Sequence, residues 1–126
     1  MMIRLSKLEE DILDKLWMLE RAFPKVLISH LNKPVPPYNT VLSAIRKLEK
    51  LGYIGYKKYG KSHEYYPVLK KEDYSRSLFN KLFHDLMGGS YETMLSYFMK
   101  EEKIDFDELE KLVNKMKNEN YKKSSD

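Results

Sequence analysis

Residues 35–68, VPPYNTVLSAIRKLEKLGYIGYKKYGKSHEYYPV, decide the fold of this chain. Pro37 suits the start of a helix and Gly52 suits the position just after its end, so the stretch predicts a helix over residues 38–51. Two β-branched or aromatic runs follow, YIGYKKY and SHEYYPV. The Gly60-Lys61 pair between these runs predicts a β-hairpin.

Two segments before this stretch are also predicted to be helices. In residues 6–20, SKLEEDILDKLWMLE, Ser6 and Glu9 have the spacing of a capping box. Apolar residues recur there at helical spacing, namely Leu8, Ile12, Leu16 and Leu19. A second, short helix is predicted to start at Pro24. Three helices followed by a hairpin is the order of elements in a winged helix.

Three further helices are predicted after residue 70. The first, EDYSRSLFNKLFHDLM, ends at Gly88-Gly89; the second is SYETMLSYFMKEE; the third begins at Asp105, which forms a capping box with Glu108. The predicted fold class is therefore mainly α with a small β-hairpin, a winged helix-turn-helix followed by a three-helix dimerisation region. We expect a winged-helix DNA-binding domain over 1–70, a helical dimerisation domain over 71–120 and a disordered tail over 121–126.

The apolar residues of the C-terminal helices favour a homodimer. A segment of about 50 residues buries too little surface to cover them by itself, so pairing with a second copy is the economical solution. A symmetric dimer also presents two DNA-binding domains at a fixed spacing, which suits a pseudo-palindromic site. The candidate dimer contacts are Leu78, Leu82, Leu86, Met94, Leu95, Phe98, Leu109, Leu112, Val113 and Met116.

The predicted helix over residues 38–51 has two chemically different faces. One arc is apolar and is expected to face the core; it holds Val41, Ala44, Ile45, Leu48 and Leu51. The opposite arc holds Asn39, Ser43, Arg46, Lys47 and Lys50, with Thr40 at its margin. Amide, hydroxyl and cationic groups are the side chains that bind base edges and phosphates of DNA. The alternative is an ordinary solvated face, but such faces usually mix both signs of charge.

The hairpin adds cationic side chains around its tip, namely Lys57, Lys58, Lys61 and His63. Strand alternation sends Lys57 and Lys58 to opposite faces, so the hairpin is predicted to contact the DNA backbone as a wing. Its five tyrosines are predicted to pack the small sheet, with stacking on unpaired bases as the alternative. These tyrosines are Tyr53, Tyr56, Tyr59, Tyr65 and Tyr66.

The charge distribution and composition limit which partners, metal sites and cellular locations are expected for this protein. Residues 1–70 carry 13 basic and 7 acidic side chains, whereas residues 71–126 carry 10 and 12, so only the first part is suited to a polyanion. The absence of cysteine excludes disulfides and thiolate metal sites. No apolar run is long enough to insert into a membrane and no secretory segment is recognised, so we expect a cytoplasmic protein.

An enzyme is not predicted. The histidines, His30, His63 and His84, have no metal-binding spacing, and no nucleophile motif or phosphate loop is present. We therefore expect no catalytic residues, no metal and no cofactor. A winged helix that binds another protein, without sequence-specific DNA binding, is the alternative function; its affinity would not collapse as salt rises.

Taken together, these elements resemble the penicillinase repressor family of winged-helix transcriptional regulators. The resemblance is carried by LSKLEEDILDKLW, by PPYNTVLSAIRKLEKLGYIGYKKYGKSHEYYPV, by KKEDYSR and by TMLSYFMKEEKIDFDELEKL, and it runs from about residue 5 to residue 117. It implies a homodimer that binds double-stranded operator DNA and represses transcription. It also implies that Tyr38, Asn39, Thr40, Ser43 and Arg46 belong to the recognition helix.

The resemblance carries one further implication. Family members that control β-lactam resistance are inactivated through a membrane protease sensor, with cleavage at an Asn-Phe bond. The matching position here is Tyr97-Phe98, where tyrosine replaces asparagine. The copper-responsive branch of the family carries C-terminal cysteines, which this chain lacks.

Overall fold

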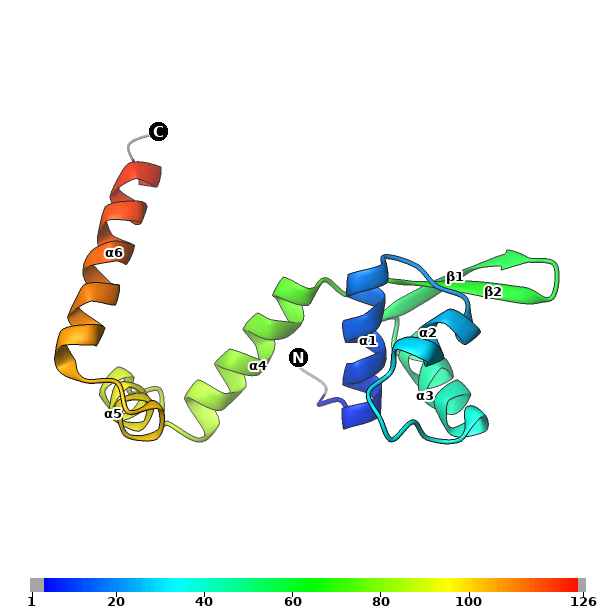
Figure 1. Cartoon of the computed structure of the whole chain (residues 1–126), viewed down its shortest axis with the longest axis horizontal. Coiled ribbons are helices and arrows are strands. Elements are labelled where there is room, and N and C mark those ends of the chain that lie inside the picture. The colour runs from blue at the N-terminus through cyan, green and yellow to red at the C-terminus, as the bar shows by residue number, and fades with distance from the viewer. Residues whose placement is uncertain (1–3, 125–126) are drawn as a thin grey trace. The chain divides into compact units, whose positions relative to one another are not determined.

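A computed structural model describes residues 4–124 of the chain, and for residues 120–124 only the backbone is described. The described residues form six helices and one β-hairpin (Figure 1), which confirms the predicted class of a winged helix followed by helices. The elements in chain order are α1 (Lys7–Leu19), α2 (Pro24–His30), α3 (Tyr38–Lys50), β1 (Ile54–Tyr59), β2 (Ser62–Pro67), α4 (Lys71–Asp85), α5 (Tyr91–Glu102) and α6 (Phe106–Ser124).

The chain forms two compact units, and the division falls between Phe79 and Asn80. This differs from the predicted boundary at residue 70, because the first turns of α4 pack with the N-terminal unit. The ring of Tyr74 is buried there, and its centroid lies 5.9 Å from that of Trp17. The helix α6 continues to Ser124, past residue 121, where the disordered tail was expected to begin; residues 125 and 126 lie outside the described part.

The capping box predicted at the start of α1 is present. Ser6 Oγ accepts a hydrogen bond from the Glu9 N–H at 3.1 Å, and Glu9 Oε1 accepts one from the Ser6 N–H at 2.7 Å. Two backbone donors that would otherwise lack partners are thereby satisfied, so the local sequence fixes where this helix begins.

The helix α3 begins and ends where its flanking residues predict. Pro37 is the N-cap, and the helix stops at Lys50, followed by Gly52 with φ of +80°. That left-handed conformation costs glycine little and most other residues much more. Val41, Ile45 and Leu48 are fully buried, so the apolar arc of the helix faces the core as predicted.

The hairpin pairs in register around the two-residue turn Gly60-Lys61. Ile54 lies opposite Pro67, Tyr56 opposite Tyr65, and Lys58 opposite His63. Gly60 has φ of +62°, a value that two-residue hairpin turns require at their first position. An additional bridge, unforeseen from the sequence, joins Ala22 to Tyr65 through two backbone hydrogen bonds of 2.9 Å.

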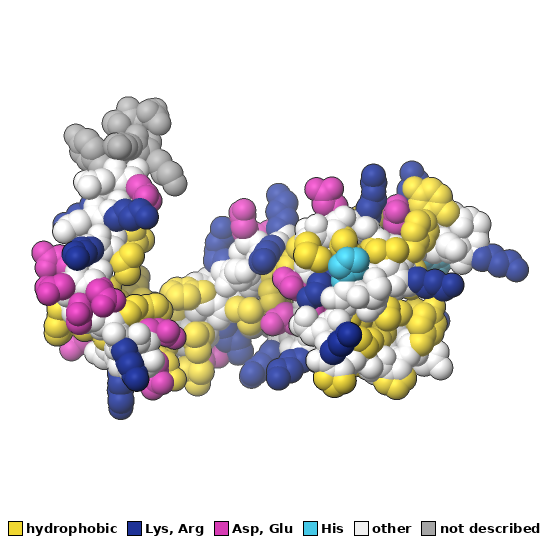
Figure 2. Space-filling view, in the orientation of Figure 1, with side chains coloured by type: hydrophobic (Ala, Val, Ile, Leu, Met, Phe, Trp, Pro, Cys, Tyr) yellow, Lys and Arg dark blue, Asp and Glu magenta, His cyan; other side chains and the backbone are white. Residues whose placement is uncertain are grey.

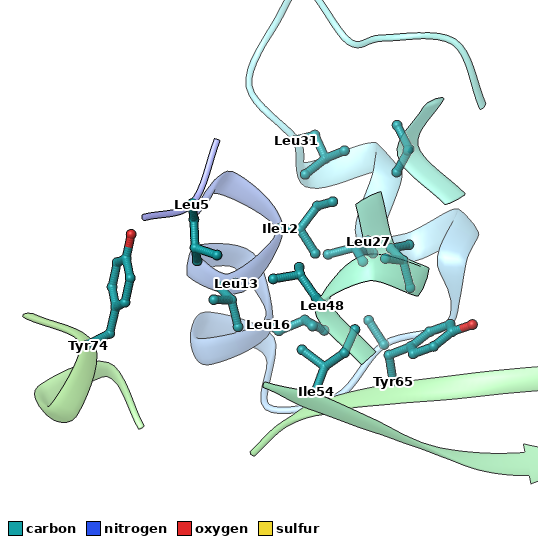
Figure 3. Packing of buried hydrophobic residues seen from close by; sticks show 13 residues of the cluster. Leu5, Ile12, Leu13, Leu16, Leu27, Leu31, Leu48, Ile54, Tyr65 and Tyr74 are labelled. Carbon is teal, nitrogen blue, oxygen red and sulfur yellow. The ribbon is translucent and has the colours of Figure 1, made fainter. Parts of the chain in front are cut away.

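The core of the N-terminal unit lies between α1, α2, α3 and the base of the hairpin. Figure 3 shows Ile12, Leu16, Leu27, Leu48 and Ile54 pointing into it from these elements. It also contains Leu13, which lies outside the predicted apolar row of α1 and is fully buried. This core packs against the apolar arc of α3, so the polar arc of the helix faces outward.

The C-terminal unit has little buried surface of its own. Among its described residues only Phe83 is buried, and no side chain of α5 is. Ser90 caps α5 through a hydrogen bond from the Thr93 N–H, and Asp105 caps α6 through one from the Glu108 N–H. Hydrophobic side chains lie open on this part of the surface (Figure 2). Of the described helices, none has both the length and the apolar composition of a membrane span.

Candidate nucleic-acid interface

The polar arc of α3 is exposed along its whole length. Tyr38, Asn39 and Thr40 open the helix, and the ring of Tyr38 is 53% exposed. Four exposed side chains follow one another at steps of four, three and four residues, which places them in one row along the helix: Asn39, Ser43, Arg46 and Lys50. We call these four residues the outer row. Among the described residues, neither cation of the outer row forms an ion pair.

The N-terminal end of α3 is electrostatically suited to phosphate. Pro37 is the N-cap without a side-chain hydrogen bond, and the first turn contains no acidic residue. No acidic side chain offsets the positive end of the helix dipole there, so this end favours an anion, although the Thr40 N–H already donates to the Pro37 carbonyl oxygen. The outer row starts at this same end, with Asn39.

Lys47 occupies a different environment from the outer row. Its Nζ lies 3.0 Å from Oε2 of Glu9, whose side chain is only 4% exposed. The sequence grouped Lys47 with the candidate DNA contacts, but it did not foresee this pair across α1 and α3. Nothing in the sequence indicated that Glu9 is buried. A capping box explains a glutamate at this position whether its side chain is buried or exposed.

The environment of Glu9 keeps its carboxylate ionised. Burial raises the pKa, but hydrogen bonds from the Ser6 N–H and from Lys47 lower it by more. The net effect is a pKa below the ordinary value of 4.5. The Glu9–Lys47 pair is therefore charged on both sides at neutral pH, with no net charge.

The wing carries its cations on both faces, as strand alternation predicts. Lys57 lies opposite Glu64 on one face, and Lys58 lies opposite His63 on the other. Lys61 is exposed in the turn, and Figure 2 shows cationic side chains (dark blue) at the tip of the hairpin. His63 is half-buried, because its ring stacks on that of Tyr56 at 4.2 Å between centroids.

The wing tyrosines pack less completely than the sequence predicts. Only Tyr65 is buried; Tyr56, Tyr59 and Tyr66 remain partly exposed. Burial and the nearby Glu49 raise the pKa of Tyr65, and Arg46 opposes them. Tyr65 therefore lies within electrostatic range of Arg46 of the outer row.

The predicted dimer contacts lie mostly on the C-terminal unit. Leu78 is the exception, because it packs half-buried against the core of the N-terminal unit. Met94 and Leu109 are half-buried within the second unit. The remaining predicted contacts are exposed: Leu82, Leu86, Leu95, Phe98, Leu112, Val113 and Met116.

The candidate proteolytic site lies inside a helix. Tyr97 and Phe98 are both exposed, but they occupy the middle of α5. A protease requires an extended substrate, so cleavage of this bond would require local unwinding of α5.

The described residues hold no group of three histidine or acidic side chains that could bind a metal. A cleft of about 690 Å³ lies in the N-terminal unit, between α1, the loop after α2 and the first turns of α4. Its three acids already accept hydrogen bonds: Glu10 from Tyr74, Asp11 from Lys15 and Asn32, and Asp14 from Lys15. The cleft thus presents no free acid as a metal ligand.

Comparison with known proteins places the chain in a family. A family model described as penicillinase repressor matches residues 5–118. The methicillin resistance regulatory protein MecI of Staphylococcus aureus strain N315 is 25% identical over 112 residues, covering 87% of this chain and 90% of that protein. The protein of the same name from Mammaliicoccus sciuri is 24% identical over the same length. With its winged helix and this match along most of its length, the chain belongs to the penicillinase repressor family of transcriptional regulators.

Proposed function

We propose that the chain is a dimeric, sequence-specific DNA-binding repressor that recognises a pseudo-palindromic operator. The recognition elements are α3 and the wing over residues 53–68. The outer row of α3 carries this proposal, because a packed core presents a strip of amide, hydroxyl and cationic side chains without a single acid in the strip. A repressor of this kind acts on cytoplasmic DNA.

The chemistry of the outer row matches the edges of base pairs in the major groove. Arg46 pairs in bidentate fashion with guanine, Asn39 pairs with adenine, and Ser43 accepts or donates to either base. Lys50 and the N–H groups at the start of α3 bind phosphates, which fixes the register of the helix on the duplex. Arg46 and Asn39 therefore determine sequence preference in this proposal.

The wing binds the sugar-phosphate backbone in this proposal. Lys57, Lys58 and Lys61 are exposed near the hairpin tip and face different sides. Such contacts add affinity for any sequence and carry little base information. The wing therefore strengthens binding and leaves the choice of site to α3.

The C-terminal unit supplies the dimer contact. Its described part buries one side chain, Phe83, and leaves seven of the predicted apolar contacts exposed. Exposed apolar surface of this extent marks an interaction site in a folded protein. Two copies joined here present two α3 helices to the two halves of a palindrome. The relatives named as methicillin resistance regulatory proteins support a role in gene regulation.

Selection of DNA from a library of genomic fragments tests the proposal. The purified full chain is expected to enrich fragments that share a short palindrome, with an affinity that falls steeply as salt rises. An Arg46→Ala chain serves as the matched variant and is expected to lose the enrichment. Recovery of no common palindrome, together with a salt-insensitive protein partner, would instead favour the protein-interaction alternative.

A further inference from the structure

Glu9 lies where an acidic residue is uncommon, in the interior at 3% exposure. Its two carboxylate oxygens have separate partners. Oε1 accepts the Ser6 N–H at 2.7 Å, and Oε2 contacts Nζ of Lys47 at 3.0 Å. A buried carboxylate requires a compensating cation, so Lys47 is bound to a charge that α1 holds in place.

The Glu9–Lys47 pair lies next to the outer row, and Lys47 is not a member of that row. Thr40 and Lys47 are seven residues apart and share a flank of α3, which is the flank that faces Glu9 on α1. The helix α3 thus carries three cations, Arg46, Lys47 and Lys50, of which one is neutralised by an acid from another helix.

We propose that Glu9 is a specificity-determining residue because it neutralises Lys47. Only Arg46 and Lys50 of α3 then present a free positive charge to DNA phosphates. The inference rests on the proposed function. Phosphate charge supplies almost all of the affinity for non-specific DNA, so an additional free cation strengthens binding to every sequence alike. By withholding one cation, Glu9 keeps the ratio of specific to non-specific affinity high.

The competing interpretation is that Lys47 contacts phosphate while it remains paired. Its side chain is 58% exposed, and an ammonium group has three donors, so contact with both partners is sterically open. The two interpretations differ in the number of counterions released when DNA binds. If Lys47 contacts only Glu9 it releases none, whereas if it also contacts phosphate it releases about one.

The salt dependence of binding to non-specific DNA tests the inference. Affinities of the full chain for a fluorescein-labelled duplex of random sequence are measured by anisotropy between about 50 and 200 mM NaCl. Glu9→Gln keeps the volume and an acceptor for the Ser6 N–H but releases Lys47. We expect its slope of log affinity against log salt to steepen by about 0.9, which is about a threefold to fourfold greater loss of affinity across this range.

Two further chains identify the source of the change. Combining Glu9→Gln with Lys47→Gln is expected to return the slope to that of the unaltered chain. Glu20→Gln removes the same charge from an exposed residue that has no ion pair among the described residues, and it is expected to leave the slope unchanged. Circular dichroism verifies that each chain is folded at the temperature of the titration.

The outcomes separate this inference from the function it rests on. Equal slopes for Glu9→Gln and the unaltered chain overturn the inference alone, as does a steep slope that persists after Lys47→Gln is added. Should Glu9→Gln unfold, Lys47→Gln decides by itself: an unchanged slope supports the inference, and a slope shallower by about 0.9 overturns it. If the unaltered chain binds no duplex at any salt concentration, the proposed function fails together with the inference.

Discussion

The hydroxyl of Tyr74 donates a 2.7 Å hydrogen bond to Oε2 of Glu10, although the two residues are 64 positions apart in the chain. A second bond runs in parallel, from Nε1 of Trp17 to the carbonyl oxygen of Leu69 at 2.8 Å. Together they attach the segment that enters α4 to the outer side of α1. This attachment explains why the first turns of α4 belong to the N-terminal unit.

Removing the hydroxyl by Tyr74→Phe tests the attachment. Burial is the largest cause that raises the pKa of Tyr74, and the hydrogen bond to Glu10 adds to it. A group with a raised pKa in the folded state stabilises the fold below its unfolded pKa, about 10 for tyrosine, and that stabilisation is lost as pH rises further. Urea unfolding should therefore show a loss of about 1 kcal/mol at neutral pH and a weaker dependence on pH above 10 than in the unaltered chain. Identical alkaline profiles would contradict the assignment.

Glu9 is expected to contribute stability that is lost at acidic pH, whereas the contribution of Tyr74 is lost at alkaline pH. The pKa of Glu9 is lower in the folded chain, because hydrogen bonds from Ser6 and Lys47 outweigh the effect of burial. Its contribution to stability is present above the ordinary pKa of 4.5, which the unfolded chain has, and is lost as pH falls through the lower folded value. Glu9→Gln should therefore be less stable than the unaltered chain at neutral pH and should lose less stability on acidification. Thermal unfolding between neutral pH and pH 3 measures the difference.

A side chain at Gly52 should destabilise the fold through the backbone conformation alone. Its φ is +80°, and a Cβ added there would meet no atom within 4 Å, so space is not the constraint. Gly52→Ala should cost about 1 kcal/mol of unfolding free energy, measured in urea. Gly52→Asn is the matched control and should cost less, because asparagine adopts positive φ more readily. Equal costs for the two substitutions would argue against a conformational cause.

Arg46 and Lys61 should affect DNA binding in different ways. Arg46→Ala removes a candidate base contact, so it should reduce affinity for the selected palindrome by about 1–3 kcal/mol and discriminate less between sequences. Lys61→Ala removes a candidate phosphate contact at the wing tip. It should weaken specific and random duplexes alike and reduce the salt slope by about 0.9. Gel shifts with both duplexes at two salt concentrations distinguish the patterns, and a sequence-dependent effect of Lys61→Ala would be unexpected.

The dimer contact is tested by placing the same charge at adjacent positions of α6. Val113 belongs to the exposed apolar residues of the C-terminal unit, whereas Asn114 is an exposed polar residue. Val113→Glu should shift the chain from dimer to monomer in light scattering after gel filtration, because burial of an unpaired charge is costly. Asn114→Glu should leave the mass unchanged. A monomeric unaltered chain would contradict the proposed assembly.

Local signals determined most of the elements. These signals affect only residues a few positions away, so their effects can be predicted from the sequence. They are the Ser6–Glu9 capping box, Pro24, Pro37, Gly52 and the Gly60-Lys61 turn. The same holds for the polar arc of α3, because helical periodicity separates its side chains from the apolar ones. The exposed row of α3 was for this reason predictable from the sequence.

Tertiary structure decided the features that join distant parts of the chain. Glu9 is buried and paired with Lys47, Ala22 bridges to Tyr65, and Tyr74 binds Glu10. Each depends on which faces of separate elements meet, and a sequence pattern records the face of one element only. The sequence by itself therefore determined the helices, the hairpin and their polar faces. Only the packing of α1 against α3 decided which of the α3 cations remain free of an ion pair. The buried carboxylate of Glu9 pairs with Lys47 because Lys47 is the cation that this packing places next to it.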